Sequence, residues 1–524
     1  MTTVADAAIE RASRFPHQVC AIEEGVAYEL ADVVAEAEAL ASALAGLGVS
    51  AGDVISFQLP NWREAITVNL GSAMLGCAVN PVVPIYRGAE MEFILADSAA
   101  RVVFVPAEFR GFRYAEAIEA MRPRLPRLAQ VIAVRADPGD EGGSTRFEDL
   151  VASGRGRSPR RPRVAADVLK MLMYTSGTTG RAKAVRHSHA TLGHAVRACA
   201  APWGIVAGTG ILVASPVTHI ASYGHGLEMP LLLGSRGVLL AQWNAKRAVE
   251  LIDSQRVEFF GGATPFLQEL LSAALEAQST LSSLRIFSCG GAAVPPELIR
   301  RANATLPGLR AARSYGMTEA PWITRGFHGD GEGELAADTD GRLTDYELRI
   351  VDDAGRALPE GREGEILVRG PSLFIGYMDA AQNAEAFDPE GFLRTGDLGV
   401  RRGPSLTITG RKKDLIIRGG ENLSAKEIED VLHGHPAVRE AAVVAMPHAR
   451  LGEGVCAYVI AQDACELTLG ELIAHCFAAG LAKQKAPERL ELVAELPRTP
   501  SGKVRKDVLR KEIAAKVAAE RPNA

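Results

Sequence analysis

The stretch MLMYTSGTTGRAKAV, residues 171–185, places hydroxyl side chains, glycines and two cations directly behind an apolar run. The backbone N–H groups of a glycine-rich loop can turn toward an anion, and Ser and Thr hydroxyls add further donors. Lys183 would bring a positive charge beside such an anion. The chemistry that this combination favours is phosphate binding.

The familiar phosphate loop, GxxxxGK[ST], does not fit these residues. Five residues after Gly177 stands Ala182, and Lys183 is followed by Ala184 rather than by a hydroxyl that could bind magnesium. A flexible Ser/Thr/Gly linker is the alternative interpretation. The apolar residues 169–174 are typical of a buried strand, however, and linkers seldom follow one directly. The sequence therefore indicates a phosphate loop that differs from the loop of the P-loop NTPases.

Four further stretches concentrate polar residues among glycines. They are residues 314–319 (SYGMTE), 394–397 (RTGD), 410–414 (GRKKD) and 497–503 (PRTPSGK). Each alone is a weak signal, because turns and solvated lysines commonly have such compositions. Together with the glycine-rich loop they supply donors for phosphates and mobile cations for developing charge. They also supply an acid for a metal (Glu319), an acid for ribose hydroxyls (Asp397) and an aromatic face for adenine (Tyr315).

The composition is that of a globular protein with more than one domain. The chain has 524 residues, of which 47% are hydrophobic and 23% charged. A net charge of −5 gives no general attraction to nucleic acid, so we expect a small-molecule partner and no nucleic acid.

The compartment that the sequence favours is the cytoplasm. Asp6 and Glu10 interrupt the N-terminal stretch where a signal peptide would need an apolar core. No apolar run reaches the roughly 18 residues of a membrane span, so we expect no integral membrane segment. Seven scattered cysteines without a CxxC pair predict neither a disulfide framework nor a zinc site.

Helix-like and strand-like patterns alternate along the chain. A helical periodicity over residues 28–40 is followed by a strand pattern at 53–59. The pair recurs as a helix at 63–74 and a strand at 78–83. Strands that alternate with helices of this length predict an α/β fold with mostly parallel sheets covered on both faces.

A domain boundary is expected near residues 403–410. After it comes a shorter αβ pattern, in which residues 424–427 read as a capping box that opens a helix over 428–432. We therefore expect a large N-terminal body of residues 1–410, a small C-terminal α/β domain of residues 411–524, and a cleft between them.

In their order along the chain, these motifs resemble those of the adenylate-forming superfamily. This superfamily includes acyl-CoA synthetases, firefly luciferases and the adenylation domains of peptide synthetases. The likeness covers nearly the whole chain and is strongest to the AMP-dependent carboxylate–CoA ligases. It implies a multi-subdomain N-terminal body of mixed and parallel sheets with a mobile C-terminal domain.

The resemblance implies an ATP site that is spread over the motifs. The β- and γ-phosphates would bind Thr175, Ser176, Gly177, Thr178, Thr179, Gly180 and Lys183. The family usually has Pro before the lysine, and Ala182 in its place loosens the loop without removing a ligand.

The remainder of the ATP site falls on five other segments of the chain. The residues implied beside the nucleotide are Gly290, Gly291, Ala292, Ser314, Tyr315, Gly316, Met317, Thr318, Asp397, Arg411 and Lys503. Among these, Tyr315 would stack on adenine, Thr318 would touch the α-phosphate, and Asp397 with Arg411 would contact the ribose. Glu319 would hold Mg²⁺.

The family's reaction has two steps, and the resemblance assigns catalytic residues to them. A carboxylate attacks the α-phosphate of ATP to give an acyl-adenylate, and a thiol then attacks the acyl carbon and releases AMP. The catalytic residues implied are Lys503, Thr318 and His219. Lys503 would bridge the carboxylate and the α-phosphate in the first step and must leave before the thiol enters.

Rotation of the C-terminal domain would remove Lys503 between the steps. The hinge that the resemblance implies is Lys413, two places after the Gly-Arg of the linker. The segment that would then face the site and leave room for the pantetheine arm of CoA contains Arg418, Gly419, Gly420 and Glu421.

The acyl pocket that the resemblance implies carries no charged side chain. Its residues are His219, Ile220, Ala221, Gly262, Ala263, Gly290, Ser314, Gly316 and Trp322. The aspartate with which amino-acid-activating relatives hold the substrate ammonium is missing here. We therefore expect an apolar acid, namely an aromatic, alicyclic or short-to-medium aliphatic acid, with Trp322 closing the far end of the pocket.

Three alternatives stay open beside an ATP-, Mg²⁺- and CoA-dependent ligase. They are a ligase that acylates a carrier protein, a luciferase-like oxygenase, and a non-catalytic module that binds an acyl-adenylate. The presence of Lys503, Glu319 and Asp397 argues against the last of these. A homodimer is left open as well.

Overall fold

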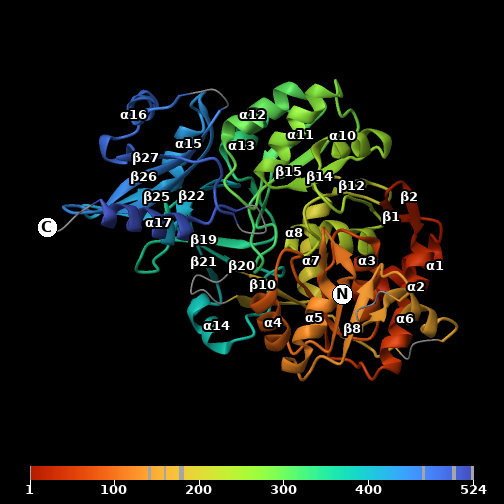
Figure 1. Ribbon diagram of the computed structural model, residues 1–524. Coiled ribbons are helices and arrows are strands. Elements are labelled where there is room, and N and C mark those ends of the chain that lie inside the picture. The colour runs from red at the N-terminus through yellow and green to blue at the C-terminus, as the bar shows by residue number, and fades with distance from the viewer. Residues whose placement is uncertain are drawn as a thin grey trace.

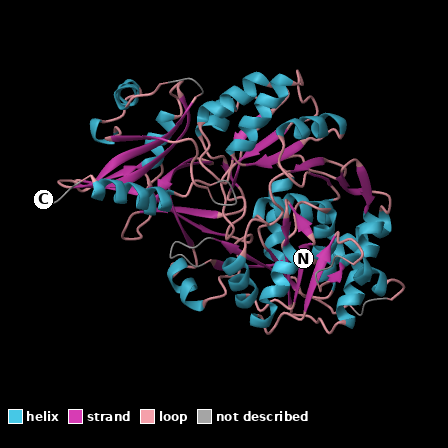
Figure 2. Ribbon diagram, viewed as in Figure 1, coloured by secondary structure: helices cyan, strands magenta, loops and turns pink. Residues whose placement is uncertain are grey.

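The structure, a computed structural model, describes residues 2–139, 143–157, 161–175, 182–462, 466–498 and 503–520. Figure 1 shows a large body formed by the N-terminal and middle parts of the chain, with a smaller C-terminal part at one side. Helices flank the strands of the body, as Figure 2 shows. The predicted α/β class with a large N-terminal and a small C-terminal domain is confirmed. The division at residue 410 stays a prediction.

The first sheet of the body has seven strands and carries the phosphate-loop sequence at one edge. In spatial order its strands are β11 (Lys183–Ser188), β10 (Leu169–Thr175), β4 (Ala78–Pro81), β3 (Val54–Phe57), β5 (Val102–Pro106), β8 (Gln130–Val134) and β9 (Thr145–Arg146). They run parallel except for β11, which is antiparallel to β10. The helix predicted at 63–74 is α3 (Arg63–Met74), and the strands predicted around it are β3 and β4.

The second sheet also has seven strands, and the ends of three of them form part of the site. In spatial order the strands are β16 (Arg310–Arg313), β15 (Ile286–Cys289), β14 (Phe259–Gly262), β12 (Gly210–Val213), β13 (Arg236–Leu239), β1 (Val19–Glu23) and β2 (Val26–Glu29). Only β2 is antiparallel to its neighbour. Tyr28 and Glu29, predicted to begin a helix, belong to β2, and α2 (Leu30–Gly46) starts after them.

A third, antiparallel sheet joins the body to the C-terminal part. Its strands in order are β17 (Thr324–Arg325), β18 (Arg342–Leu343), β22 (Ser405–Arg411), β21 (Leu393–Arg402), β20 (Gly364–Arg369) and β19 (Glu347–Val351). A separate hairpin in the body consists of β6 (Glu108–Phe109) and β7 (Phe112–Arg113).

The C-terminal sheet follows the third sheet after a short 3₁₀ turn, η3 (Lys412–Asp414). Its strands are β24 (Glu421–Ser424), β23 (Leu415–Arg418), β26 (Gly452–Ala461), β25 (Val438–His448) and β27 (Arg489–Leu492). It is covered by α15 (Ala425–Leu432), α16 (Leu469–Ala478) and α17 (Lys506–Ala519). Only half of the predicted capping box is present: the Ser424 hydroxyl accepts a hydrogen bond from the backbone N–H of Glu427, whereas the Glu427 carboxylate accepts from Lys485. The helix already begins at Ala425.

The remaining helices cover the sheets of the body. They are α1 (Val4–Arg14), α4 (Gly88–Asp97), α5 (Tyr114–Met121), α6 (Phe147–Gly154), α7 (His189–Ala200), α8 (Ile220–Tyr223), α9 (Met229–Leu233), α10 (Ala245–Ser254), α11 (Thr264–Glu276), α12 (Pro296–Thr305), α13 (Gly333–Asp338) and α14 (Ala380–Ala386). A π-helical turn, η2 (Gly224–Glu228), links α8 to α9.

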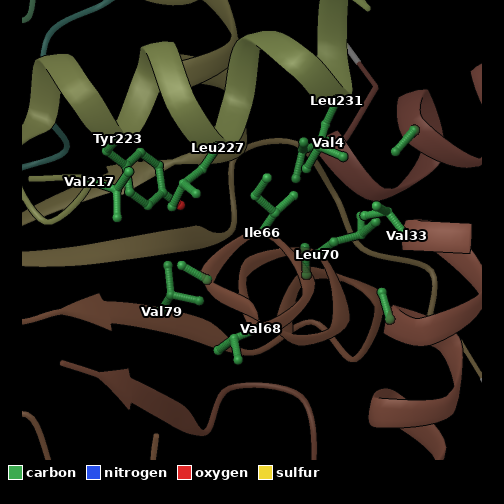
Figure 3. Close-up of a cluster of buried hydrophobic side chains, with 14 of the residues drawn as sticks. Val4, Val33, Ile66, Val68, Leu70, Val79, Val217, Tyr223, Leu227 and Leu231 are labelled. Atoms are coloured by element: carbon green, nitrogen blue, oxygen red, sulfur yellow. The ribbon is translucent and has the colours of Figure 1, made fainter. Parts of the chain in front are cut away.

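The core between the first two sheets fixes the helical segment that begins beside the site. In Figure 3, Ile66 and Leu70 of α3 face Tyr223, Leu227 and Leu231 of the segment 220–233. All five side chains are buried, and burying one aliphatic side chain of this size contributes about 1.5–3 kcal/mol. The start of this segment is therefore held firmly.

The described cysteines and helices were compared with the needs of a disulfide and of a membrane span. The six described cysteines are buried and unbridged, and Cys465 lies outside the described residues. Among the described helices, none combines the length and the apolarity needed to cross a bilayer.

Candidate active site

The phosphate-loop sequence connects two paired strands. Thr175, the last residue of β10, lies opposite Lys183, the first residue of β11. The predicted phosphate ligands between them, Ser176, Gly177, Thr178, Thr179 and Gly180, lie outside the described residues. The Lys183 ammonium lies 5.1 Å from the ring centroid of Tyr377, a residue that the sequence analysis did not identify.

The turn that contains Thr318 and Glu319 is held by two side chains. The Tyr377 hydroxyl donates to Oε1 of Glu319 at 2.7 Å. Nε2 of the buried His187 lies 2.7 Å from the carbonyl oxygen of Thr318. Because a carbonyl only accepts, this His187 nitrogen carries the proton and donates. Burial lowers the pKa of His187 to about 4, so the ring is neutral near pH 7.

Glu319 is a buried carboxylate with cations nearby. Burial raises its pKa, and the hydrogen bond from Tyr377 and the charges of Lys503 and Lys183 act in the opposite direction. No group of three or more His, Cys, Asp or Glu side chains in the described part of the chain could hold a metal ion by itself. Nucleotide-bound Mg²⁺ usually takes one or two carboxylates together with phosphate oxygens. Glu319 fits that role as a single carboxylate.

The two predicted ribose contacts lie directly opposite each other on β21 and β22. Arg411 Nε is 2.6 Å from Oδ1 of Asp397, and the Tyr315 hydroxyl donates to Oδ2 of Asp397 at 2.7 Å. The backbone N–H of Asp397 donates to Thr395 Oγ1 at 3.1 Å. Each carboxylate oxygen has two acceptor sites, so Asp397 can still accept bonds from a ribose diol. The same bonds orient the Tyr315 ring.

Lys503 reaches this group from the C-terminal part of the chain. Desolvation and the charge of Arg411 lower the pKa of Lys503 to about 8, although the residue as a whole is still exposed to solvent. Asp397 and Glu319 raise this pKa, so both carboxylates are within electrostatic reach of the ammonium. Burial, with a smaller contribution from Lys503, lowers the pKa of His219 to about 4. Lys503 thus lies within electrostatic reach of Glu319, Asp397 and His219.

The predicted acyl-pocket residues gather at the ends of neighbouring strands. Gly262 ends β14, and Gly290 and Ser314 directly follow β15 and β16. The backbone N–H of Gly290 donates to the Gly262 carbonyl at 3.1 Å. A Cβ at Gly290 would lie 2.5 Å from the Ser314 carbonyl oxygen, so only glycine fits there. His219, the N-cap of α8, is followed by Ile220 and Ala221 at the start of that helix.

The other predicted glycines of this region lie in loops with little space or with unusual backbone angles. A Cβ at Gly316 would lie 2.6 Å from the backbone nitrogen of Trp322. Gly291 has φ +81°, in the left-handed region that favours glycine. Ala263 is the N-cap of α11, and Ala292 directly follows Gly291. The backbone N–H of Met317 donates to the Ala320 carbonyl at 3.1 Å.

Trp322 is a buried residue with the unusual φ of +49°. Its ring centroid lies 5.5 Å from that of His225 and 6.3 Å from that of Trp203. Neither of these two aromatic partners was predicted from the sequence. Burial lowers the pKa of His225 to about 3, so this ring is also neutral. Trp322 is therefore fixed among aromatic rings next to the predicted acyl-pocket residues.

Replacing Trp322 with alanine is expected to widen the range of accepted acids toward longer ones. The substitution removes a large buried ring, and the surrounding rings can close the space only in part. Rates with straight-chain acids of increasing length, measured for both proteins, test this. An unchanged length profile would show that Trp322 does not limit the pocket. Trp243→Ala, which removes an indole packed against Phe260 and Phe266, serves as the control.

The predicted CoA-path segment forms a tight hairpin turn between β23 and β24. Arg418 pairs with Glu421, and the two residues between them, Gly419 and Gly420, have φ of +60° and +88°. Such a pair is typical of a type I′ turn, which glycine forms without strain. Arg418 also forms an ion pair with Glu488, at 2.6 Å.

Comparisons with known proteins show the family of this chain. The family model for the AMP-binding enzyme matches residues 9–378, and that for the AMP-binding enzyme C-terminal domain matches residues 427–503. A medium-chain fatty-acid–CoA ligase of Escherichia coli (strain K12) is 33% identical over 98% of this chain and 90% of its own length. A 2-hydroxy-7-methoxy-5-methyl-1-naphthoate–CoA ligase of Streptomyces carzinostaticus is 31% identical over 96% of this chain and 91% of its own length.

A solved structure has the same fold. The ATP-bound MatB from Rhodopseudomonas palustris superposes with a TM-score of 0.86 and 26% identity, covering 97% of this chain and 98% of that one. The family models alone match more than half of the chain. The chain belongs to the AMP-binding enzyme family, in the acid–CoA ligase branch of the adenylate-forming superfamily.

Proposed function

We propose that this AMP-forming ligase activates an apolar carboxylic acid as an acyl-adenylate and then transfers the acyl group to CoA. The observation that carries the proposal is that Lys503 lies within electrostatic reach of Glu319, Asp397 and His219. Lys503 comes to these groups from the C-terminal part of the chain. The attack of a carboxylate on the α-phosphate of ATP requires a cation, and the Lys503 ammonium supplies one at this place.

In the first step, a carboxylate oxygen of the acid forms a bond to the α-phosphorus, and the bond to the pyrophosphate oxygen breaks. Lys503 stabilises the charge that develops between the carboxylate and the α-phosphate. Lys183 faces the departing phosphates, and Asp397 holds the ribose. Mg²⁺ bound by Glu319 and the phosphates would supply further neutralisation of negative charge.

In the second step, the CoA thiol loses its proton to solvent, its sulfur forms a bond to the acyl carbon, and the bond to the AMP oxygen breaks. His219 is neutral, so it adds no charge beside the apolar acyl group. The C-terminal domain turns about Lys413, which withdraws Lys503 and brings the hairpin of residues 418–421 to the site. The glycines of that hairpin give the pantetheine arm room.

The substrate that we propose is an aromatic, alicyclic or short-to-medium aliphatic acid. The predicted pocket residues carry no ionised group, since His219 is neutral, and an apolar pocket selects by size. Two relatives act, by their names, on a medium-chain fatty acid and on a substituted naphthoate. Both acids have a large apolar part, which supports the proposal.

A panel of carboxylic acids tests this function in one assay. Acid-dependent exchange between ATP and labelled pyrophosphate, measured without CoA, reports the first step alone. Adding CoA should then release AMP and give the thioester of the same acids. Exchange only with amino acids, or AMP release only with a carrier protein, would contradict the proposed substrate or acceptor.

The first step is expected to slow as the pH rises through about 8. The charge of Lys503 is present below its pKa of about 8 and is lost above it, so its stabilisation of the transition state disappears on the alkaline side. A pH profile of pyrophosphate exchange measures this. Lys503→Arg should move the falling limb to higher pH, because guanidinium stays protonated. If the rate of the arginine variant falls at the same pH as that of the wild type, the fall is due to a group other than Lys503.

A further inference from the structure

Tyr377 touches two residues that the proposed function assigns to different parts of ATP. Its hydroxyl donates to Oε1 of Glu319 at 2.7 Å. Its ring faces the ammonium of Lys183, which lies 5.1 Å from the ring centroid. One buried side chain thus contacts both the candidate metal carboxylate and the lysine beside the phosphate loop.

The backbone around Tyr377 is tied to the strand that leaves the phosphate loop. Residues 375–378 lie along β11, where the Ile375 N–H donates to the Arg186 carbonyl at 2.9 Å and the Met378 N–H donates to the Ala184 carbonyl at 3.1 Å. Tyr377 itself forms an antiparallel bridge with Val185. The segment therefore acts as an added edge strand, and β11 sets its position.

The side chain of Tyr377 is also fixed by packing. It is buried, and its ring lies edge-on to Phe374, with 4.9 Å between centroids and 70° between planes. The Phe374 N–H donates to the Glu319 carbonyl at 2.8 Å, so the same segment binds the backbone of Glu319 as well. Tyr377 cannot move without disturbing the turn that carries the carboxylate.

We propose that Tyr377 is a positioning residue that holds Glu319 and Lys183 in a fixed relation to each other, so that metal and phosphates bind as one unit. The inference rests on the proposed function of these two residues. The hydroxyl donates to one carboxylate oxygen and thereby decides how the carboxylate faces a cation. The ring attracts the lysine ammonium through its negative face.

The two contacts can be separated because they use different parts of the side chain. Tyr377→Phe removes the hydroxyl and keeps the ring. Tyr377→Leu removes both. Tyr377→Phe should alter only the Mg²⁺ dependence, which involves Glu319. Tyr377→Leu should also alter the KM for ATP, which involves Lys183.

Tyr377→Phe is expected to raise the Mg²⁺ concentration that gives half-maximal pyrophosphate exchange about tenfold. Loss of one hydrogen bond to a charged group has an effect of this size. At saturating Mg²⁺ its KM for ATP should stay within about twofold of the wild type, because the cation–π contact remains. Tyr377→Leu should show the metal effect and, in addition, a KM for ATP raised about fivefold. Binding of Mn²⁺ in the presence of a non-hydrolysable ATP analogue, followed by electron paramagnetic resonance, gives the metal affinity without turnover.

Two control variants separate positioning from other effects. Tyr346→Phe removes another buried hydroxyl of the same hydrophobic cluster, one that donates to the Pro321 carbonyl at 3.1 Å, and should leave the metal dependence unchanged. Glu319→Gln tests the metal assignment itself.

The outcomes distinguish the inference from the proposed function beneath it. If Glu319→Gln shifts the Mg²⁺ and Mn²⁺ dependence and Tyr377→Phe does not, Tyr377 is not a positioning residue. If Tyr346→Phe shifts the Mg²⁺ dependence equally, the effect comes from a general change in packing, which would also overturn the inference. If Glu319→Gln leaves the metal dependence unchanged, the metal role in the proposed function fails, and the inference fails with it.

Discussion

Replacing Lys413 with proline is expected to leave adenylate formation within a few-fold of the wild type and to lower CoA-thioester formation by orders of magnitude. A large rotation between two domain poses must be absorbed by a few backbone dihedral angles in the connector. Proline fixes φ near −65° and removes the N–H. The chain would then stay in the pose in which Lys503 lies in the site.

The surroundings of Lys413 support its choice as the hinge. It lies in the short turn η3, which follows β22 of the third sheet and precedes β23 of the C-terminal sheet along the chain. Its carbonyl accepts a hydrogen bond of 3.1 Å from Arg510, which also forms an ion pair of 3.0 Å with Asp414. These contacts tie the turn to the C-terminal part.

Lys413→Ala is the matched control for the proline variant. It should spare both half-reactions, because the freedom of the backbone matters more than the charge. Pyrophosphate exchange and the conversion of a supplied acyl-adenylate to the CoA thioester measure the two steps separately. Equal damage to both steps in the proline variant, or damage to neither, would mean that Lys413 is not the hinge.

Replacing Lys503 with alanine is expected to slow adenylate formation by about 10²-fold or more, since a preorganised charge at the transition state is lost. Thioester formation from a supplied acyl-adenylate should stay nearly intact, because Lys503 has left the site by then. Single-turnover measurements of each half-reaction provide the comparison. Equal loss in both steps would refute the role assigned to Lys503.

Lys516→Ala is the control for this variant. Lys516 lies in α17, and its ammonium forms ion pairs of 2.7 Å with Glu491 and Glu512 at the surface of the C-terminal part. Both substitutions remove one lysine from the same domain, so a general effect of charge would appear in both. Only the Lys503 variant should lose adenylate formation.

The sequence predicted the fold where local patterns and packing agree. The helix at 63–74 and the strands beside it were predictable because an α/β body repeats strand and helix at short spacing. Tyr28 and Glu29 were wrongly predicted as helical, since pairing with β1 overrides their local preference. Tertiary contacts of this kind cannot be recognised from a short stretch of sequence.

The candidate site was predictable only in its motifs. Glu319, Asp397 and Lys503 stand in short polar segments whose order along the chain is distinctive. Tyr377 and His187 were missed because their contacts span 58 and 131 residues, and neither residue stands in one of the motifs. The positive φ of Trp322 was equally unpredictable, because such angles are rare in residues with a bulky side chain.

The most direct test of the account follows an oxygen atom from the acid into AMP. An accepted carboxylic acid labelled with ¹⁸O in both carboxylate oxygens is incubated with ATP, Mg²⁺, CoA and the enzyme, and the products are analysed by mass spectrometry. If the carboxylate attacks the α-phosphate, each AMP released carries one ¹⁸O and the thioester retains the other. Label in pyrophosphate or inorganic phosphate, or AMP without label, would contradict an acyl-adenylate intermediate.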